Sequence, residues 1–239
     1  KNGQFGAGNI SVKDKEKELD IILQEVAVEK MQVNEVTGSV FANGVQWQKA
    51  DVIINSIGSA KKDSSNAPII DLKNIRGANT TVNATARGKL ITTTLQKIFL
   101  NSLLKKPGTK VLMDGLDITG NQLQIKGNQL NLSVETYDVA DNKNSSFHQI
   151  VYKSDNGKTE TNISIPALTL TPHVQPLLNG DIALDAITII KPVINLHLAA
   201  KSITDEYKKT GLPKIDASEL RLIQPILNFT QARDSGTTT

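Results

Sequence analysis

The chain contains no cysteine, which excludes disulfide bonds, thiolate metal sites and cysteine nucleophiles among its 239 residues. Aromatic residues make up only 4%, so a hydrophobic core has to be built mainly from isoleucine, leucine and valine. There is also no apolar run of about 18 residues, the length that a membrane-spanning helix needs. The aliphatic residues are therefore the most informative part of the sequence.

Charge of one sign is not concentrated anywhere, because the net charge is only +3 and no block of lysine and arginine occurs. Proteins that follow a phosphate backbone need such a block, so nucleic acid is a poor candidate partner. The densest charge run, residues 13–20, alternates in sign and is typical of a solvated loop or strand end.

The apolar residues that are present recur in one spacing, in which steps of three residues and two residues alternate. The full copies are Leu23, Val26, Val28 and Met31; Leu95, Ile98, Leu100 and Leu103; and Leu184, Ile187, Ile189 and Pro192. Shorter or looser copies are Met113, Leu116 and Ile118; Ile165, Leu168 and Leu170; and Ala217, Leu220, Leu222 and Pro225. This spacing gives no single face on a helix. On a strand, a step of two keeps the face, and a step of three keeps it only if a bulge absorbs one residue.

Two stretches repeat each other almost residue for residue, namely ITIIKPVINL at 187–196 and LRLIQPILNF at 220–229. Each has a proline where the phase of the spacing shifts, and proline is tolerated in sheets mainly at edges, strand starts and bulges. We therefore expect strands over 184–198 and 217–230 that bend near Pro192 and Pro225. Repetition further indicates that neighbouring strands bend at the same level, so that the whole sheet curves along one line.

Short turn signals between the apolar segments, such as KPG at 106–108 and KGN at 126–128, predict tight connections between strands. The expected fold is all-β with at most one or two short helices, a curved antiparallel meander that forms an open groove or half-barrel. Residues 95–106 could form a helical stripe, but a strand is favoured, and 202–211 is a helix candidate. One elongated domain should cover residues 1–231, followed by a tail or linker at 232–239.

Motifs for chemistry are absent: the sequence has no nucleophile elbow, phosphate-binding loop, zinc-protease helix or EF-hand loop. The histidines lack an acidic partner at ligand spacing, and they are His148, His173 and His197. We therefore expect no catalytic residue, no metal site and no cofactor. The many N-x-[ST] sequons fall partly inside expected strands, which favours the Ser/Thr/Asn-rich composition of a bacterial envelope protein over glycan sites.

The kinked strands written LDAITIIKPVINLHL and ASELRLIQPILNF, together with LMDGLDITGNQLQIKG, resemble those of the AsmA-like envelope proteins, relatives of TamB and of other bridge-like lipid transfer proteins. The resemblance covers about residues 90–231 and, more faintly, 10–58. It implies a long sheet rolled into a groove with an apolar inside, a location in the periplasm or elsewhere in a bacterial envelope, and transfer or shelter of phospholipid between membranes. The family's N-terminal anchor is missing, and because the chain begins at Lys1 without Met we expect it to be part of a longer protein.

A curved sheet with one aliphatic face needs something to cover that face, because large exposed apolar patches are rare on monomers. Acyl chains suit an aliphatic lining, since they require burial without directional bonds. The candidate lipid-binding residues share equivalent places in the repeated spacing: Leu116, Ile118, Leu123, Ile125, Leu168, Leu170, Ile187, Ile189, Ile194, Leu196, Leu220, Leu222, Leu227 and Phe229.

Two other functions stay open from the sequence. A second sheet could cover the aliphatic face, which would make the chain a structural or adhesive β-sandwich or solenoid module of an envelope or surface protein. An enzyme acting on glycans from a β-solenoid would need carboxylates clustered in a cleft.

Overall fold

A computed structural model describes residues 2–14, 19–55, 67–86, 88–157, 159–178, 182–198 and 215–232. Its regular elements are strands apart from one short helix, so the expected all-β class is confirmed. The first strands are β1 (Asn2–Asp14), β2 (Leu19–Val33), β3 (Val40–Trp47), β4 (Lys49–Ile54), β5 (Ile70–Ala86), β6 (Lys89–Lys105), β7 (Leu112–Asp114) and β8 (Asp117–Gly127). They are followed by β9 (Leu130–Ala140), β10 (Ser145–Asp155), β11 (Thr159–Pro172), α1 (Val174–Leu178), β12 (Ile182–Ile190), β13 (Val193–Leu198), β14 (Ile215–Ile223) and β15 (Ile226–Gln231).

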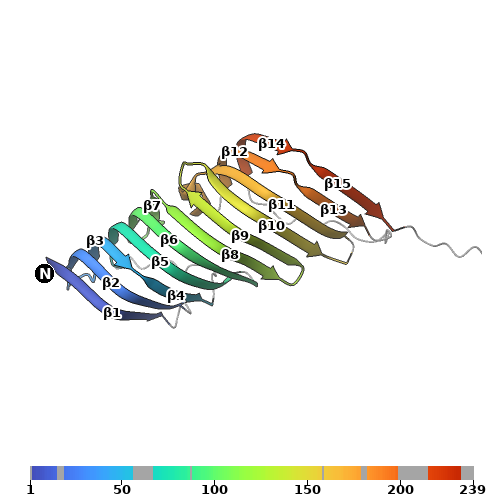
Figure 1. The fold of residues 1–239 in the computed structure, drawn as a ribbon. Helices are drawn as coiled ribbons and strands as arrows, with labels where there is room; N and C mark the ends of the chain where they lie inside the picture. Colours follow the sequence, from blue (N-terminus) through green and yellow to red (C-terminus); the bar gives the residue numbers. More distant parts are fainter. Residues whose placement is uncertain are drawn as a thin grey trace, which may run out of the picture.

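The strands belong to one 15-stranded mixed sheet, and they follow one another across it in chain order like the rungs of a β-solenoid. Figure 1 shows this order, with β1 at one end of the sheet and β14 and β15 at the other. Three pairs of elements each continue one long strand across a break: β3 with β4, β12 with β13, and β14 with β15.

The expected meander is wrong in one respect, because the sheet is not antiparallel throughout. Strands β3 and β4 lie parallel to β5, and β12 and β13 lie parallel to β14 and β15. A parallel neighbour requires the chain to return to the starting end of the sheet before the next strand begins. The residues before β5 and before β14 predict only polar connections in the sequence. A polar connection does not determine the direction of the strand that follows it.

The repeated ten-residue stretches lie side by side in this parallel arrangement, in register. Ile187 pairs with Leu220, Ile189 with Leu222, and Ile194 with Leu227. Asn195 also pairs with Asn228, whose side-chain amide donates to the Asn195 Oδ1 at 2.7 Å. The repetition of the stretch therefore places identical or similar residues side by side on adjacent parallel strands.

The predicted kinks at the two prolines are confirmed. Strand β12 ends at Ile190 and β13 begins at Val193, while β14 ends at Ile223 and β15 begins at Ile226. The strand predicted for 95–106 is also confirmed, as most of β6. The helix candidate at 202–211 lies outside the described residues.

Kinks occur at one level across the whole sheet, and a residue with a left-handed backbone marks most of them. These residues have φ between 46° and 53°: Glu25, Asn79, Gln122, Gln149, Lys191 and Gln224. The strand pairing places them opposite one another or opposite other irregular positions, such as Gln48 and Pro166. Each kink absorbs one residue, so that apolar residues three apart stay on one face.

A second line of kinks crosses the sheet between β3 and β8. It is marked by Gly44, Asn74 and Gly115, which all have positive φ. In this part of the sheet the three-two-three spacing therefore corresponds to strands that bend twice.

Candidate functional site

The core of the molecule lies on one face of this single sheet, which we call the apolar face. Val134, Tyr137 and Ile150 form its buried cluster, with exposed fractions of 4 to 7%. Side chains from β6, β8, β9, β10 and β11 pack against this cluster: Leu95, Ile118, Leu123, Leu132, Val139, Phe147, Ile165 and Leu168. Because these residues come from five strands on both sides of the kink line, the kinks keep their side chains on the same side of the sheet.

Cross-strand pairing extends the apolar face over most of the sheet, since directly paired residues share a face. One row runs through Ile91, Ile125, Leu132, Tyr152, Ile163, Ile194 and Leu227. A second row runs through Leu95, Gly120, Tyr137, Phe147, Leu168, Ile189 and Leu222. Neither row contains a charged side chain.

Strand pairing and packing bring thirteen of the fourteen residues chosen from the sequence onto this face. Ile118 and Leu123 pack directly on the buried cluster, and Leu116 lies half-buried between β7 and β8. Leu170, Ile187 and Leu220 form one paired row, and Leu196 pairs with Phe229. Those on β14 and β15 are exposed by 52 to 65%, namely Leu220, Leu222, Leu227 and Phe229.

No second layer covers the apolar face within the described ranges. The substantial contacts between elements there join neighbouring strands, join β9 to β11, or are made by the short helix α1. Side chains of the buried cluster are therefore covered mainly by their neighbours on the same face. Most of the surrounding aliphatic side chains stay half-exposed.

The strands of this face that the spacing missed include β3 and β5. Their face residues include Trp47 on β3 and Gly77 and Thr80 on β5, so the strands do not read as aliphatic. The Trp47 ring lies over Gly77, where an added Cβ would come within 2.2 Å of it, and its Nε1 donates to Thr80 Oγ1 at 2.9 Å. A glycine beneath a large aromatic residue on the next strand is the signal that could have located them.

Tyr137 repeats this arrangement at the centre of the sheet. Its ring lies over Gly120 and stacks on Phe147 with centroids 6.3 Å apart, and its hydroxyl and Thr93 Oγ1 are 2.6 Å apart. Burial raises the pKa of the Tyr137 phenol above its usual value of 10, and the hydrogen bond with Thr93 opposes this only in part. The polar groups of both aromatic side chains are thus satisfied within an apolar surface.

This burial predicts an alkaline loss of stability. A raised pKa means that the fold favours the neutral phenol, so the stabilisation is complete below pH 10 and disappears as the pH rises through the higher pKa of the folded state. Tyr137→Phe should lower stability at neutral pH by about 1 kcal/mol through the lost hydrogen bond, yet flatten its decline at alkaline pH. Urea unfolding of both proteins across this pH range is the measurement, and parallel pH profiles would contradict the expectation.

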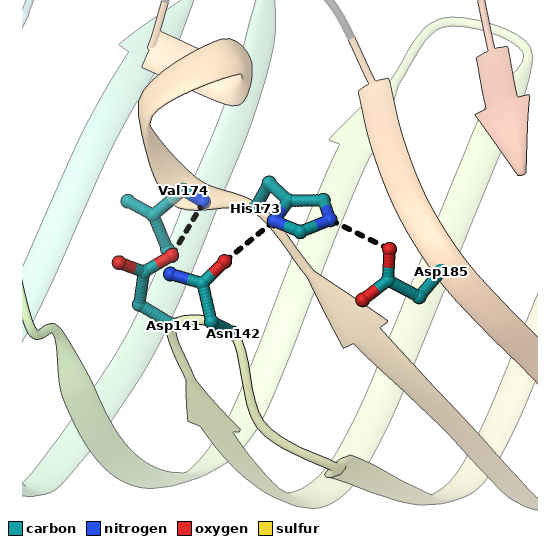
Figure 2. Close-up of polar contacts among 5 residues, drawn as sticks. All are labelled: Asp141, Asn142, His173, Val174 and Asp185. Carbon is teal, nitrogen blue, oxygen red and sulfur yellow. Dashed lines mark hydrogen bonds and ion pairs between the residues drawn. The ribbon is translucent and has the colours of Figure 1, made fainter.

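A polar cluster lies where β9 and β11 end and β12 begins, beside α1, which packs near β7 and β12 (Figure 2). The ring of His173 is held between Asn142 Oδ1, at 2.5 Å from Nδ1, and Asp185 Oδ1, at 2.8 Å from Nε2. Asp141 Oδ1 accepts a hydrogen bond from the backbone N–H of Val174 at 2.9 Å. His173 therefore has an acidic partner in space, Asp185 on β12, although none stands at ligand spacing in the sequence.

The geometry of the cluster nevertheless indicates a structural role, in which its hydrogen bonds hold separate segments together. Its partners tie together the turn after β9, the start of α1 and strand β12, and no nucleophilic side chain joins the three hydrogen-bonded groups. Among the described residues no group of three or more possible ligands could hold a metal ion. The other two histidines are exposed, and His197 Nδ1 is 2.8 Å from Thr230 Oγ1.

A hollow of about 430 Å³ lies over β3, β5 and β6, but its charged groups already have partners. The guanidinium of Arg76 lies 5.9 Å from the centroid of the Phe99 ring. Lys97 Nζ lies 3.7 Å from Asp117 Oδ1. The hollow therefore offers less for a ligand than the apolar face does.

Comparisons with known proteins assign no family to this arrangement. No protein-family model, no curated protein and no solved structure matches the chain. In the part of the chain that is described, no helix has the length and hydropathy of a membrane span.

Proposed function

We propose that the chain binds the acyl chains of phospholipid on its apolar face, which would line an open groove, and that it does so without catalysis. The observation that supports this most is the combination of an extensive aliphatic face with the absence of a second layer over it in the described residues. Patches larger than a few hundred square ångströms usually mark an interaction surface. Acyl chains are suited to the two paired rows because those rows offer apolar contact and few polar groups.

The kinks that cross the strands at one level, together with the packing of the buried cluster, support a concave form for this face. Side chains with exposed fractions below 8% need close neighbours, and a concave surface makes side chains on adjacent strands converge. Following the resemblance to AsmA-like proteins, we propose that the chain handles lipid in a bacterial cell envelope, next to or between membranes. The lipid would be held by its chains, with its head group left toward solvent.

A matched pair of substitutions on β12 tests lipid binding. Ile189 lies on the apolar face, paired with Leu168 and Leu222, whereas the adjacent Ile190 points to the opposite face; both are half-buried. Losing one aliphatic contact removes about 1.5–3 kcal/mol of apolar burial, which corresponds to about tenfold to hundredfold weaker binding. We expect Ile189→Asp to lose most of its copurifying phospholipid and Ile190→Asp to retain it.

Native mass spectrometry and organic extraction of the purified proteins give the readout, with circular dichroism as the check that each variant is folded. Absence of lipid from the parent chain, or equal loss in both variants, would contradict the proposal.

The alternative function is that of a structural or adhesive solenoid module. It is favoured by the in-register parallel stacking of the repeated stretch and by the Asn195–Asn228 contact, since repeat proteins stack equivalent residues in this way. A parent chain that folds cooperatively and carries no lipid would favour this alternative.

A further inference from the structure

The last strand of the sheet, formed by β14 and β15, has an unusual free edge. Within the described part of the chain, no strand pairs with its outer side. Its large apolar side chains have exposed fractions of 43 to 65%: Leu220, Leu222, Ile223, Ile226, Leu227 and Phe229. Edge strands are normally protected by charges, bulges or covering elements, because an unprotected edge pairs with other strands.

Little charge protects this edge. Between Leu220 and Phe229 the only charged side chain is Arg221, and its Nε lies 2.6 Å from Glu219 Oε1, so the pair largely neutralises itself. The kink at Gln224 also does not end the apolar pattern, which continues from Leu222 through Pro225 to Leu227.

The spacing along this edge is self-complementary. Counting outward from the midpoint between Ile223 and Gln224, Leu222 and Leu220 lie on one side and Pro225 and Leu227 lie on the other at equal steps. Antiparallel pairing of two copies with Leu222 opposite Pro225 therefore also places Leu220 opposite Leu227 on the same face. The sheet already contains this geometry, because β9 and β10 pair across an aligned kink with Val134 opposite Ile150 and Tyr137 opposite Phe147.

We propose that a second copy of this chain covers the edge, through a two-fold symmetric, antiparallel pairing of β14–β15 with β14–β15. Such a contact is isologous and closes at two copies, the commonest form of soluble assembly. The opposite edge, β1, is a poorer partner, because its exposed large apolar residues are only Phe5 and Val12 and pairing it with β14 would not close. In the dimer the two apolar faces form one continuous face.

The contact is small, since a stable interface usually buries about 800 Å² per partner and a single strand supplies less than this. The dimer should therefore depend on concentration, and sedimentation equilibrium of the purified chain can measure it. We expect Leu227→Lys to sediment as a monomer where the parent is a dimer. The control is Leu112→Lys, because Leu112 is also exposed, by 51%, but lies on β7 away from the edge.

The lack of cysteine allows the symmetry to be tested directly. In the proposed register, Ile223 of each copy lies next to the two-fold axis, with its Cα about 6 Å from its counterpart, within disulfide range. Ile223→Cys should form a covalent dimer on mild oxidation, whereas Thr230→Cys, far from the axis, should not.

A parent chain that stays monomeric, a dimer that survives Leu227→Lys, or equal cross-linking of both cysteine variants would overturn the proposal. The outcome is independent of lipid binding: a dimer without lipid contradicts only the proposed function, and lipid bound to a monomer contradicts only the dimer.

Discussion

Ile150→Asp should destabilise the protein by more than about 3 kcal/mol, the largest effect that we expect from any single substitution on the apolar face. Ile150 has an exposed fraction of 7% and contacts Val134 and Tyr137 at the centre of the buried cluster. A carboxylate there would be desolvated with no cation beside it, because its paired neighbours are Val134 and Ile165. Since whole domains are stable by only about 5–15 kcal/mol, much of the population should unfold at moderate urea concentration.

The neighbouring residue provides the control. Val151 is half-buried and points to the opposite face, where its partners are Ser133 and Ser164. Val151→Asp leaves the carboxylate close to water and hydroxyl groups, so its cost should stay within about 1 kcal/mol. Urea unfolding followed by circular dichroism measures both. Equal losses would mean that the two faces are equally dry, which is incompatible with a single sheet that buries only one of them.

The strands and their kinks could be predicted from the sequence because both are local. A step of three residues between apolar positions reports a bulge inside the strand that contains it, as between Leu222 and Pro225. The candidate face followed for the same reason, since residues at equivalent places in bulged strands have to pair. Strand β5 was not recognised because Gly77 and Thr80 stand where other strands carry aliphatic residues, and its burial depends on Trp47 from a distant segment.

Features that depend on how separate segments meet could not be predicted. The parallel direction of β5 and β14 is set by the route of the preceding connection and leaves no trace in the strands themselves. The contact between His173 and Asp185 arises because the residue before α1 lies beside the first residues of β12. A spacing of twelve residues between two side chains carries no signal for such a contact.

Gly120→Val should cost about 2–4 kcal/mol, although valine is intrinsically the better residue in a strand. A Cβ at residue 120 would lie 2.3 Å from the Tyr137 ring, so the ring has to move. Moving it breaks the hydrogen bond with Thr93, worth about 1 kcal/mol, and disturbs the stacking on Phe147.

Gly8→Val on β1 is the matched control for this substitution, because nothing lies within 4 Å of a Cβ added at Gly8. It should leave stability unchanged or raise it slightly, since replacing glycine reduces the freedom of the unfolded chain. A second comparison isolates the ring itself. In a Tyr137→Ala background the space above residue 120 is empty, so Gly120→Val should then cost little. If it costs as much there as in the parent chain, the glycine is required by the backbone at the kink and not by the aromatic ring that covers it.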